Sequence, residues 1–172
     1  MATPDPSHLS AFTGRWELEA AGTAVEFHTK AVWFLPVRGT FQAKEGQGAV
    51  SADGTITGTL VLDAASVNTK NKKRDTHLRT ADFFDVEKFP TITYEVTSGR
   101  VTGPGALELD GTLTVHGQTG PLPVSATYAV ADDVVTLSAT ADVDRSAWGV
   151  TLTPMGAGLK NKLVVTARYR KI

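Results

Sequence analysis

The strongest constraint on the fold is a period-two alternation of apolar and polar residues that recurs along most of the chain. Side chains of a β-strand point alternately to the two faces of its sheet, so each alternating run predicts a strand with one apolar and one polar face. The runs cover residues 16–18, 25–27, 56–62, 92–96, 107–115, 122–130, 135–143 and 163–169. Glycine and proline separate them as turn residues. The sequence therefore predicts seven or eight antiparallel strands.

The apolar faces of these strands need a common interior. A closed barrel and a two-sheet sandwich are the two solutions, and closure also removes exposed sheet edges. One segment interrupts the pattern, since the alternation fails from about Ala64 to Lys88 and apolar residues stand there at loose helical spacings. We expect one or two short helices at about 66–88, ending before Phe89–Pro90, because a residue that precedes proline avoids the α region. Residues 1–14 are expected to form a loosely ordered tail, and residues 15–172 a single domain.

Several positions on the predicted apolar faces are unusually small, which bears on whether the interior is filled. A ring of eight strands encloses a lumen that side chains can just fill or that can hold one small ligand. Alanine and glycine on the inner face leave room for a guest, whereas the Trp and Phe residues of facing strands could fill the same space, and the sequence leaves both open. Between Thr29 and Trp33 the alternation changes face, so Trp33 and Phe34 are assigned to neither side. The residues expected to line the lumen are Val25, Phe27, Phe41, Leu60, Leu62, Ile92, Tyr94, Val96, Leu109, Leu113, Ala126, Ala139 and Ala141.

Composition and motifs exclude several classes of function. The chain has no cysteine, so disulfide scaffolds, thiolate metal sites and cysteine nucleophiles are excluded. Its net charge of −1 offers no basic field for nucleic acid. The four histidines lie far apart, without metal-ligand spacing, and the sequence contains no phosphate loop, dinucleotide fingerprint or nucleophile elbow. We therefore expect no catalytic residue, no metal and no cofactor other than a bound lipid.

The most distinctive local feature is the run from Lys70 to Arg79, which holds five basic residues in ten positions. Its lysines are expected to lie on a solvated face. Arg74, Asp75, His77 and Arg79 are expected either to contact a ligand or to form a purely structural polar clamp. Of these, Arg74, His77 and Arg79 are the candidates for contact with a polar headgroup. In the same region, Leu78, Phe83 and Phe84 are expected to cover or shape the entrance of the lumen.

These segments resemble the YceI-like polyisoprenoid-binding family. The match is to its core R-D-x-H-L-[RK]-[ST]-x-D-F-F-D followed by K-[YF]-P-x-I, at residues 74–92. Three satellites occur in the family's order, namely residues 37–41 (V-x-G-x-F), 110–117 (G-x-L-T-[IV]-x-G) and 145–149 (R-x-[DE]-[FW]-G). The resemblance extends from about Trp16 to Lys171, and it departs from the family pattern at Ala147, where an acidic residue is usual.

The resemblance implies a mainly β fold, an eight-stranded antiparallel lipocalin-like barrel, whose tunnel holds a long isoprenoid or similar amphiphilic lipid. The expected function is non-enzymatic binding, carriage or sequestration of a polyisoprenoid, a prenyl quinone or a fatty-acid-like lipid. The alternative is a stress-related interaction protein with a filled core and a docking surface at 66–88. The expected partner is the lipid, and nucleic acid is not expected as a partner. We expect no membrane-spanning segment in the chain. Transient contact with a membrane and formation of a homodimer are left open. Many family members are exported, but the first residues here do not resemble a signal peptide, which favours a cytoplasmic location.

Overall fold

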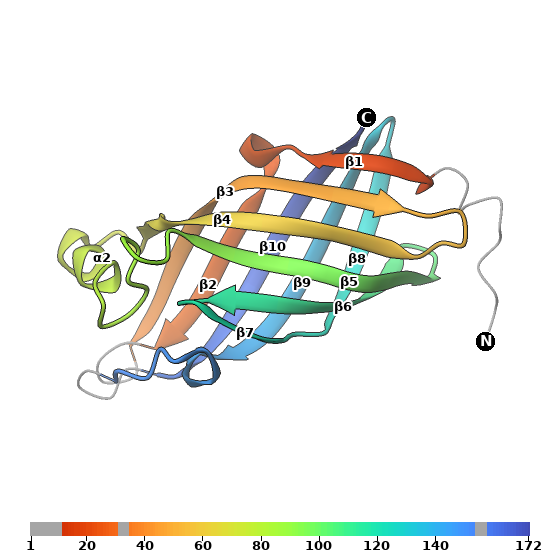
Figure 1. The fold of residues 1–172 in the computed structure, drawn as a ribbon. Coiled ribbons are helices and arrows are strands. Elements are labelled where there is room, and N and C mark those ends of the chain that lie inside the picture. Colours follow the sequence, from red (N-terminus) through yellow and green to blue (C-terminus); the bar gives the residue numbers. More distant parts are fainter. Residues whose placement is uncertain (1–11, 31–34, 154–157) are drawn as a thin grey trace.

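The structure is a computed structural model that describes residues 12–30, 35–153 and 158–172. Ten strands and one α-helix account for most of these residues (Figure 1). The strands are β1 (Gly14–Leu18), β2 (Ala24–Lys30), β3 (Pro36–Val50), β4 (Ile56–Asn68), β5 (Thr91–Gly103), β6 (Ala106–Val115), β7 (Gln118–Pro121), β8 (Val124–Ala131), β9 (Val134–Asp144) and β10 (Lys160–Lys171). The helix is α2 (Lys72–Leu78), and two 3₁₀ turns are η1 (Ala20–Gly22) and η3 (Arg145–Trp148). No helix of the described ranges is long and apolar enough to cross a membrane.

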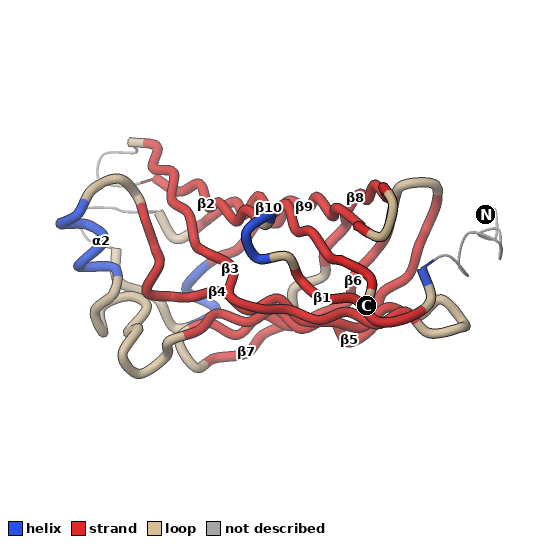
Figure 2. The backbone as a smooth tube through the Cα atoms, turned by 90° about the horizontal axis from the view of Figure 1, so that it is seen from above, coloured by secondary structure: helices blue, strands red, loops and turns tan. Residues whose placement is uncertain are grey.

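Eight of the strands form a closed antiparallel ring. Its order is β10–β2–β3–β4–β5–β6–β8–β9, and β9 pairs with β10 to close it. The remaining two strands pair with strands of the ring. Like β2, β1 pairs with both β10 and β3, and like β8, β7 pairs with β6. Seen from above, the ring is an elongated tube with α2 at one end (Figure 2). The predicted eight-stranded barrel is confirmed, and its closure excludes the sandwich.

The two ends of the barrel differ. The α2 end carries α2 and the turn η3, whereas the opposite end carries the β3–β4, β5–β6 and β8–β9 connections (Figure 1). We call the opposite end the N end. The first eleven residues of the predicted tail and the unassigned Trp33 and Phe34 lie outside the described residues. Phe12 packs against Trp16 and its neighbours, and β1 already begins at Gly14.

β3 is a long strand that the alternation does not reveal. Its sequence includes glycines at positions 39, 46 and 48, which interrupt the apolar pattern. Gly39 pairs with Phe27 across β2 and β3, and a Cβ at Gly39 would collide with the Phe27 ring. The ring therefore covers the bare backbone of its partner, as aromatic residues commonly do beside glycine in a sheet. At position 39 the inward face therefore has no apolar side chain of its own, although Val37 and Phe41 on either side are buried.

The predicted helical region begins later than its sequence pattern suggests. β4 continues to Asn68, and the pairing with β3 shifts from Gln42↔Asp63 to Thr40↔Asn68, which leaves three extra residues on β4. Ser66 stabilises this bulge, because its Oγ accepts from the Gln42 N–H at 2.7 Å and donates to the Asp63 carbonyl. Bulges change the face that successive residues occupy. The buried residues Ala64 and Val67 therefore stand three apart within a strand, a spacing that resembles a helix.

The helix α2 is short, and its start is explained by a local cap. The Asn71 side chain accepts a hydrogen bond from the backbone N–H of Arg74 at 3.0 Å, and Asn71 itself has extended backbone angles. Asparagine is among the favoured residues for this capping role. After Arg79 the chain continues through turns to Phe89, so the region holds one helix of seven residues, followed by turns.

Candidate functional site: an apolar lumen with a cationic mouth

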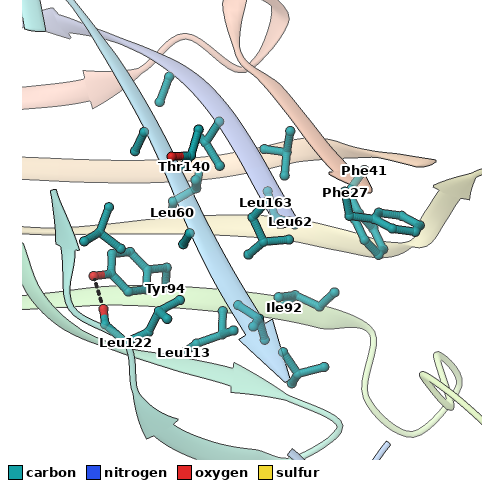
Figure 3. A pocket seen from close by; sticks show the side chains of 18 of the residues that line it. Phe27, Phe41, Leu60, Leu62, Ile92, Tyr94, Leu113, Leu122, Thr140 and Leu163 are labelled. Carbon is teal, nitrogen blue, oxygen red and sulfur yellow. Dashed lines mark hydrogen bonds between the residues drawn. The ribbon is translucent and has the colours of Figure 1, made fainter. Parts of the chain in front are cut away.

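A cavity of about 700 Å³ runs along the interior of the barrel. Its volume lies within the range of ~300–1,000 Å³ that is usual for small-molecule sites. Figure 3 shows side chains from strands around the ring pointing into it, among them Phe27, Leu62 and Tyr94. All thirteen residues predicted to line the lumen lie on its wall, which establishes their position but does not test their contact with a ligand.

The middle of the lumen stays open because small side chains meet there. Ala126 of β8 pairs with Ala139 of β9, which pairs in turn with Val165 of β10, and Ala141 pairs with Leu163. The described aromatic residues lie mostly toward the ends. Phe27, Phe41 and Phe84 contact one another in succession at the α2 end, with ring centroids 5.4 Å apart in each pair. The aromatic residues thus leave the centre unfilled, which argues against the filled core of the alternative hypothesis.

Two tyrosines contribute polar atoms to the wall, and both are satisfied by backbone. The Tyr94 hydroxyl donates to the Leu122 carbonyl at 2.6 Å (Figure 3), and the Tyr169 hydroxyl donates to the Thr59 carbonyl at 2.9 Å. Burial, aided by the nearby Asp110 charge, raises the pKa of Tyr94 to about 12, and burial also raises the pKa of Tyr169. Both phenols are therefore neutral at physiological pH, so these two groups add no charge to the lumen.

The predicted entrance residues lie at the α2 end of the cavity. Leu78, Phe83 and Phe84 all line it, and Phe83 is buried with 7% of its surface exposed. The Phe83 ring meets the His77 ring edge-on at 5.1 Å between centroids. These apolar side chains therefore lie directly beside polar residues of α2. Such a boundary between apolar and polar surface suits the junction between the tail and the headgroup of an amphiphile.

A buried polar cluster joins α2 to the end of β4. Asp75 is only 6% exposed, and its carboxylate accepts from the Thr69 backbone N–H at 2.9 Å and from the Thr69 hydroxyl at 2.5 Å. The Arg74 guanidinium donates to the Thr69 hydroxyl at 2.8 Å and to the Thr69 carbonyl at 2.9 Å. Asp75 and Arg74 therefore act as the structural clamp that the sequence left open, although Arg74 also lines the cavity.

Replacing Asp75 with alanine should destabilise this end of the barrel. The substitution leaves the Thr69 N–H and hydroxyl without their buried acceptor, a loss that costs about 1–3 kcal/mol. Urea unfolding of Asp75→Ala and of the exposed control Asp82→Ala would measure the difference. Equal stabilities of the two variants would contradict a clamping role for Asp75.

The structure separates the three predicted headgroup residues. Arg74 and His77 line the cavity, but Arg79 does not. The Arg79 guanidinium instead donates to the Ala65 carbonyl at 2.9 Å and the Val67 carbonyl at 3.4 Å, which binds the helical segment to the β4 bulge. His77 contacts Asp82 at 2.9 Å. The prediction of Arg79 as a headgroup residue therefore receives no support from its position.

Arg145 is a cavity residue that the sequence reasoning did not select. Its Nε donates to the Gly158 carbonyl at 3.1 Å and its Nη1 to the Val150 carbonyl at 2.7 Å, and its guanidinium lies 5.6 Å from the centre of the Phe83 ring. Burial lowers the pKa of Arg145, opposed by the negative charge of Asp144, but an arginine remains charged in proteins. The signal was present in the 145–149 motif, which supported the family resemblance without indicating that its arginine faces the lumen.

Trp148 closes the wall at a place where two neighbouring strands do not pair. β8 pairs with β9, but β7, which continues its position, pairs with β6 alone among the described strands. Trp148 follows β9 in η3, lies over Gly120 of β7, and donates from its indole to the Leu113 carbonyl of β6 at 2.7 Å. The buried Trp148 side chain therefore covers the wall between β7 and β9, where no pairing of the described strands closes it.

A closed antiparallel barrel around an apolar lumen defines a lipocalin-like class of protein. The sequence profile of the YceI-like domain matches residues 16–169, and the chain belongs to the YceI-like family. A UPF0312 protein of Ectopseudomonas mendocina is 34% identical over 106 residues, which cover 60% of this chain and 56% of that protein. A UPF0312 protein of Vibrio cholerae is 29% identical over 114 residues, 65% of this chain and 60% of that protein. The matched regions thus span about three fifths of these relatives.

Solved structures share the fold at low sequence identity. Burkholderia cenocepacia BcnA superimposes with a TM-score of 0.79 at 19% identity, covering 88% of this chain and 98% of that one. A polyisoprenoid binding domain from Saccharophagus degradans superimposes with a TM-score of 0.71 at 15% identity, covering 91% and 98%. The predicted family resemblance is confirmed.

Proposed function

We propose that the protein binds one long apolar amphiphile, with the tail in the lumen, and carries or sequesters it. The observation that carries the proposal is the cavity of about 700 Å³, whose wall is apolar along its length and which the described side chains leave unfilled. Burying apolar surface is favourable by about 0.8 kcal/mol per methylene, so such a site gains affinity from chain length. A polyisoprenoid suits the elongated lumen, and the structural likeness to a polyisoprenoid binding domain supports that ligand class.

The proposal is for a binding protein and not for an enzyme. The lumen tyrosines have their hydroxyls engaged with backbone carbonyls, and Asp75 is enclosed by Thr69. None of these groups is arranged as an acid–base pair around an apolar chain. The arrangement supports holding a hydrocarbon, for which shape and area are sufficient.

Native mass spectrometry of the purified protein, followed by organic extraction, tests the proposal. We expect a discrete added mass that extracts as a prenyl or fatty chain, or one equivalent of geranylgeraniol taken up by ligand-free protein. Binding of a series of linear alcohols should strengthen about fourfold per added methylene until the lumen is full. A bare mass of 18.2 kDa after incubation with prenols, quinones and fatty alcohols would contradict the proposal and would favour a docking role for residues 66–88.

Phe12 is expected to slow the escape of a bound tail through the N end. Its ring meets Tyr128 edge-on at 5.5 Å between centroids, its carbonyl accepts from the Trp16 indole at 2.9 Å, and it lines the cavity. Phe12→Ala removes this cover, so the dissociation rate of geranylgeraniol should rise roughly tenfold, while Phe12→Leu, which keeps apolar volume, should change it little. Stopped-flow displacement measures both rates. Equal rates for the wild type and Phe12→Ala would show that the tail does not reach this end.

A further inference from the structure

The charged residues on the cavity wall all carry the same sign. Among the described residues that line the cavity, Lys30, Lys73, Arg74 and Arg145 are cationic, and none is aspartate or glutamate. The chain as a whole has 17 basic and 18 acidic residues, so this bias does not follow from composition. Residues 31–34 and 154–157, which the structure does not describe, contain no acidic residue in their sequence. The bias is therefore a property of this site.

All four cations stand at the α2 end. Lys30 ends β2, Lys73 and Arg74 belong to α2, and Arg145 opens η3 directly after β9. They therefore come from three elements that are distant in sequence and that the barrel brings to one mouth (Figure 1). None of them forms an ion pair with any other residue that the structure describes. The charge of Asp144 acts on Arg145, but Asp144 does not line the cavity. The cations on the wall therefore repel one another, and an anion placed among them would relieve that repulsion.

Arg145 is the member best placed to bind such an anion. A guanidinium has five N–H donors, and only two hydrogen bonds from Arg145 to described residues are formed, both to carbonyls that fix its position. The neighbouring Asp144 carboxylate accepts from the Ser146 N–H at 3.0 Å and the Ser146 hydroxyl at 2.5 Å, and it does not line the cavity. Arg145 is thus held in place beside Phe83 with donors to spare, at the boundary between the apolar lumen and the mouth.

The other groups at the mouth divide into two kinds. Arg74 is committed to Thr69, and His77 faces Asp82, so both have protein partners. Lys30 and Lys73 are exposed and contribute charge without a role in holding the fold. An anion at this mouth would therefore be bound by Arg145 directly and attracted over a longer range by the two lysines. Charge-assisted hydrogen bonds of arginine to phosphate or carboxylate oxygens are about twice as strong as neutral ones.

We infer that the α2 mouth binds an anionic headgroup, a phosphate or carboxylate, whose apolar tail occupies the lumen. This inference rests on the proposed function, because the tail is what brings the headgroup to the mouth. It narrows the ligand from any long apolar amphiphile to one with a charged end. The tail end then lies toward Phe12 and the charged end beside Arg145.

Two probes with the same tail separate the headgroup from the tail. Geranylgeranyl monophosphate and geranylgeraniol differ only in the phosphate, and their dissociation constants can be measured by competition with a fluorescent lipid. The wild type should bind the phosphate at least tenfold more tightly. Raising the salt concentration should reduce that preference, because the lysines act through solvent. Inorganic phosphate at millimolar concentration should displace neither probe, since the tail supplies most of the affinity.

Variants assign the preference to named residues. Arg145→Gln should bring the two dissociation constants within about twofold of each other, while Arg145→Lys, which keeps the charge, should retain part of the preference. Arg145 also holds the loop after η3, so the double variant Lys30→Gln/Lys73→Gln provides a second test without that structural role, and it should lower the preference several-fold. Arg100→Gln is the matched control, because Arg100 is exposed on β5 and does not line the cavity. Thermal unfolding of each variant checks that the barrel is intact.

The outcomes distinguish this inference from the proposed function. Equal binding of both probes by the wild type would overturn the anionic headgroup and leave the lipid-binding barrel in place. A preference that survives in folded Arg145→Gln and in the double lysine variant would overturn the assignment to this mouth. Displacement of the phosphate probe by inorganic phosphate would show a site for free phosphate and not for a lipid headgroup. Failure of both probes to bind would count against the proposed function itself.

Discussion

Ala139→Phe should abolish most lipid binding and leave the fold intact. Ala139 lines the lumen and pairs with Ala126, so a ring there projects into the lumen at a place where two small side chains meet. If the ring excludes about three or four methylenes of a tail, the loss is about 3 kcal/mol, or roughly a hundredfold in the dissociation constant of geranylgeraniol. Because the ring enters open space and displaces no side chain, the midpoint of thermal unfolding should not fall.

Ala129→Phe provides the matched control for this prediction. Ala129 lies on the neighbouring strand β8, is exposed and does not line the cavity. It should bind geranylgeraniol as tightly as the wild type does. Equal binding by Ala139→Phe and the wild type would show that the tail does not pass this point, and a fall in the melting temperature of Ala139→Phe would show that the lumen is more tightly packed than its volume implies.

Trp148→Ala should cause the largest loss of stability of any single substitution considered. The side chain is only 6% exposed, belongs to the core at the α2 end, and fills the gap between β7 and β9. Removal of a buried tryptophan costs about 3–5 kcal/mol through lost burial and the cavity left behind. It also leaves the Leu113 carbonyl without its indole donor.

Trp148→Phe separates packing from the hydrogen bond. It keeps most of the ring over Gly120 and removes the donor, so its cost should be about 1–2 kcal/mol. Urea unfolding followed by far-ultraviolet circular dichroism measures both variants without relying on tryptophan fluorescence. A loss below ~1 kcal/mol for Trp148→Ala would contradict the role of this side chain in closing the wall.

The parity of the strands was the most informative signal in the sequence. Each predicted lumen residue belongs to an alternating run or to a family motif, and every one of them lies on the cavity wall. Parity works in a barrel because one face of every strand must point inward. It failed where the backbone departs from regular pairing, as at the β4 bulge, where Ala64 and Val67 stand at a helical spacing.

The mouth of the barrel could not be predicted in the same way. A run of basic residues shows where positive charge lies in the sequence but not which side chains point toward the cavity. Arg79 belongs to the same run as Arg74, but its guanidinium donates to carbonyls of β4. Arg145 lies about seventy residues away in sequence and reaches the mouth only because β9 ends there. Strand β3 was not predicted for a similar reason. Gly39 has no side chain that shows which face it occupies, and the Phe27 ring of a neighbouring strand covers it. Such features depend on contacts between distant elements, which local patterns do not record.

The most direct measurement of where a ligand lies is an isotope-filtered NOE experiment on protein with labelled alanine methyl groups and bound geranylgeraniol. Ala126, Ala139 and Ala141 line the lumen, whereas Ala129 faces outward on the same wall and serves as an internal control. We predict NOEs from the prenyl chain to the three lumen methyls and none to Ala129. A bound chain with no NOE to the lumen methyls, or with NOEs to Ala129 instead, would contradict a tail-binding lumen.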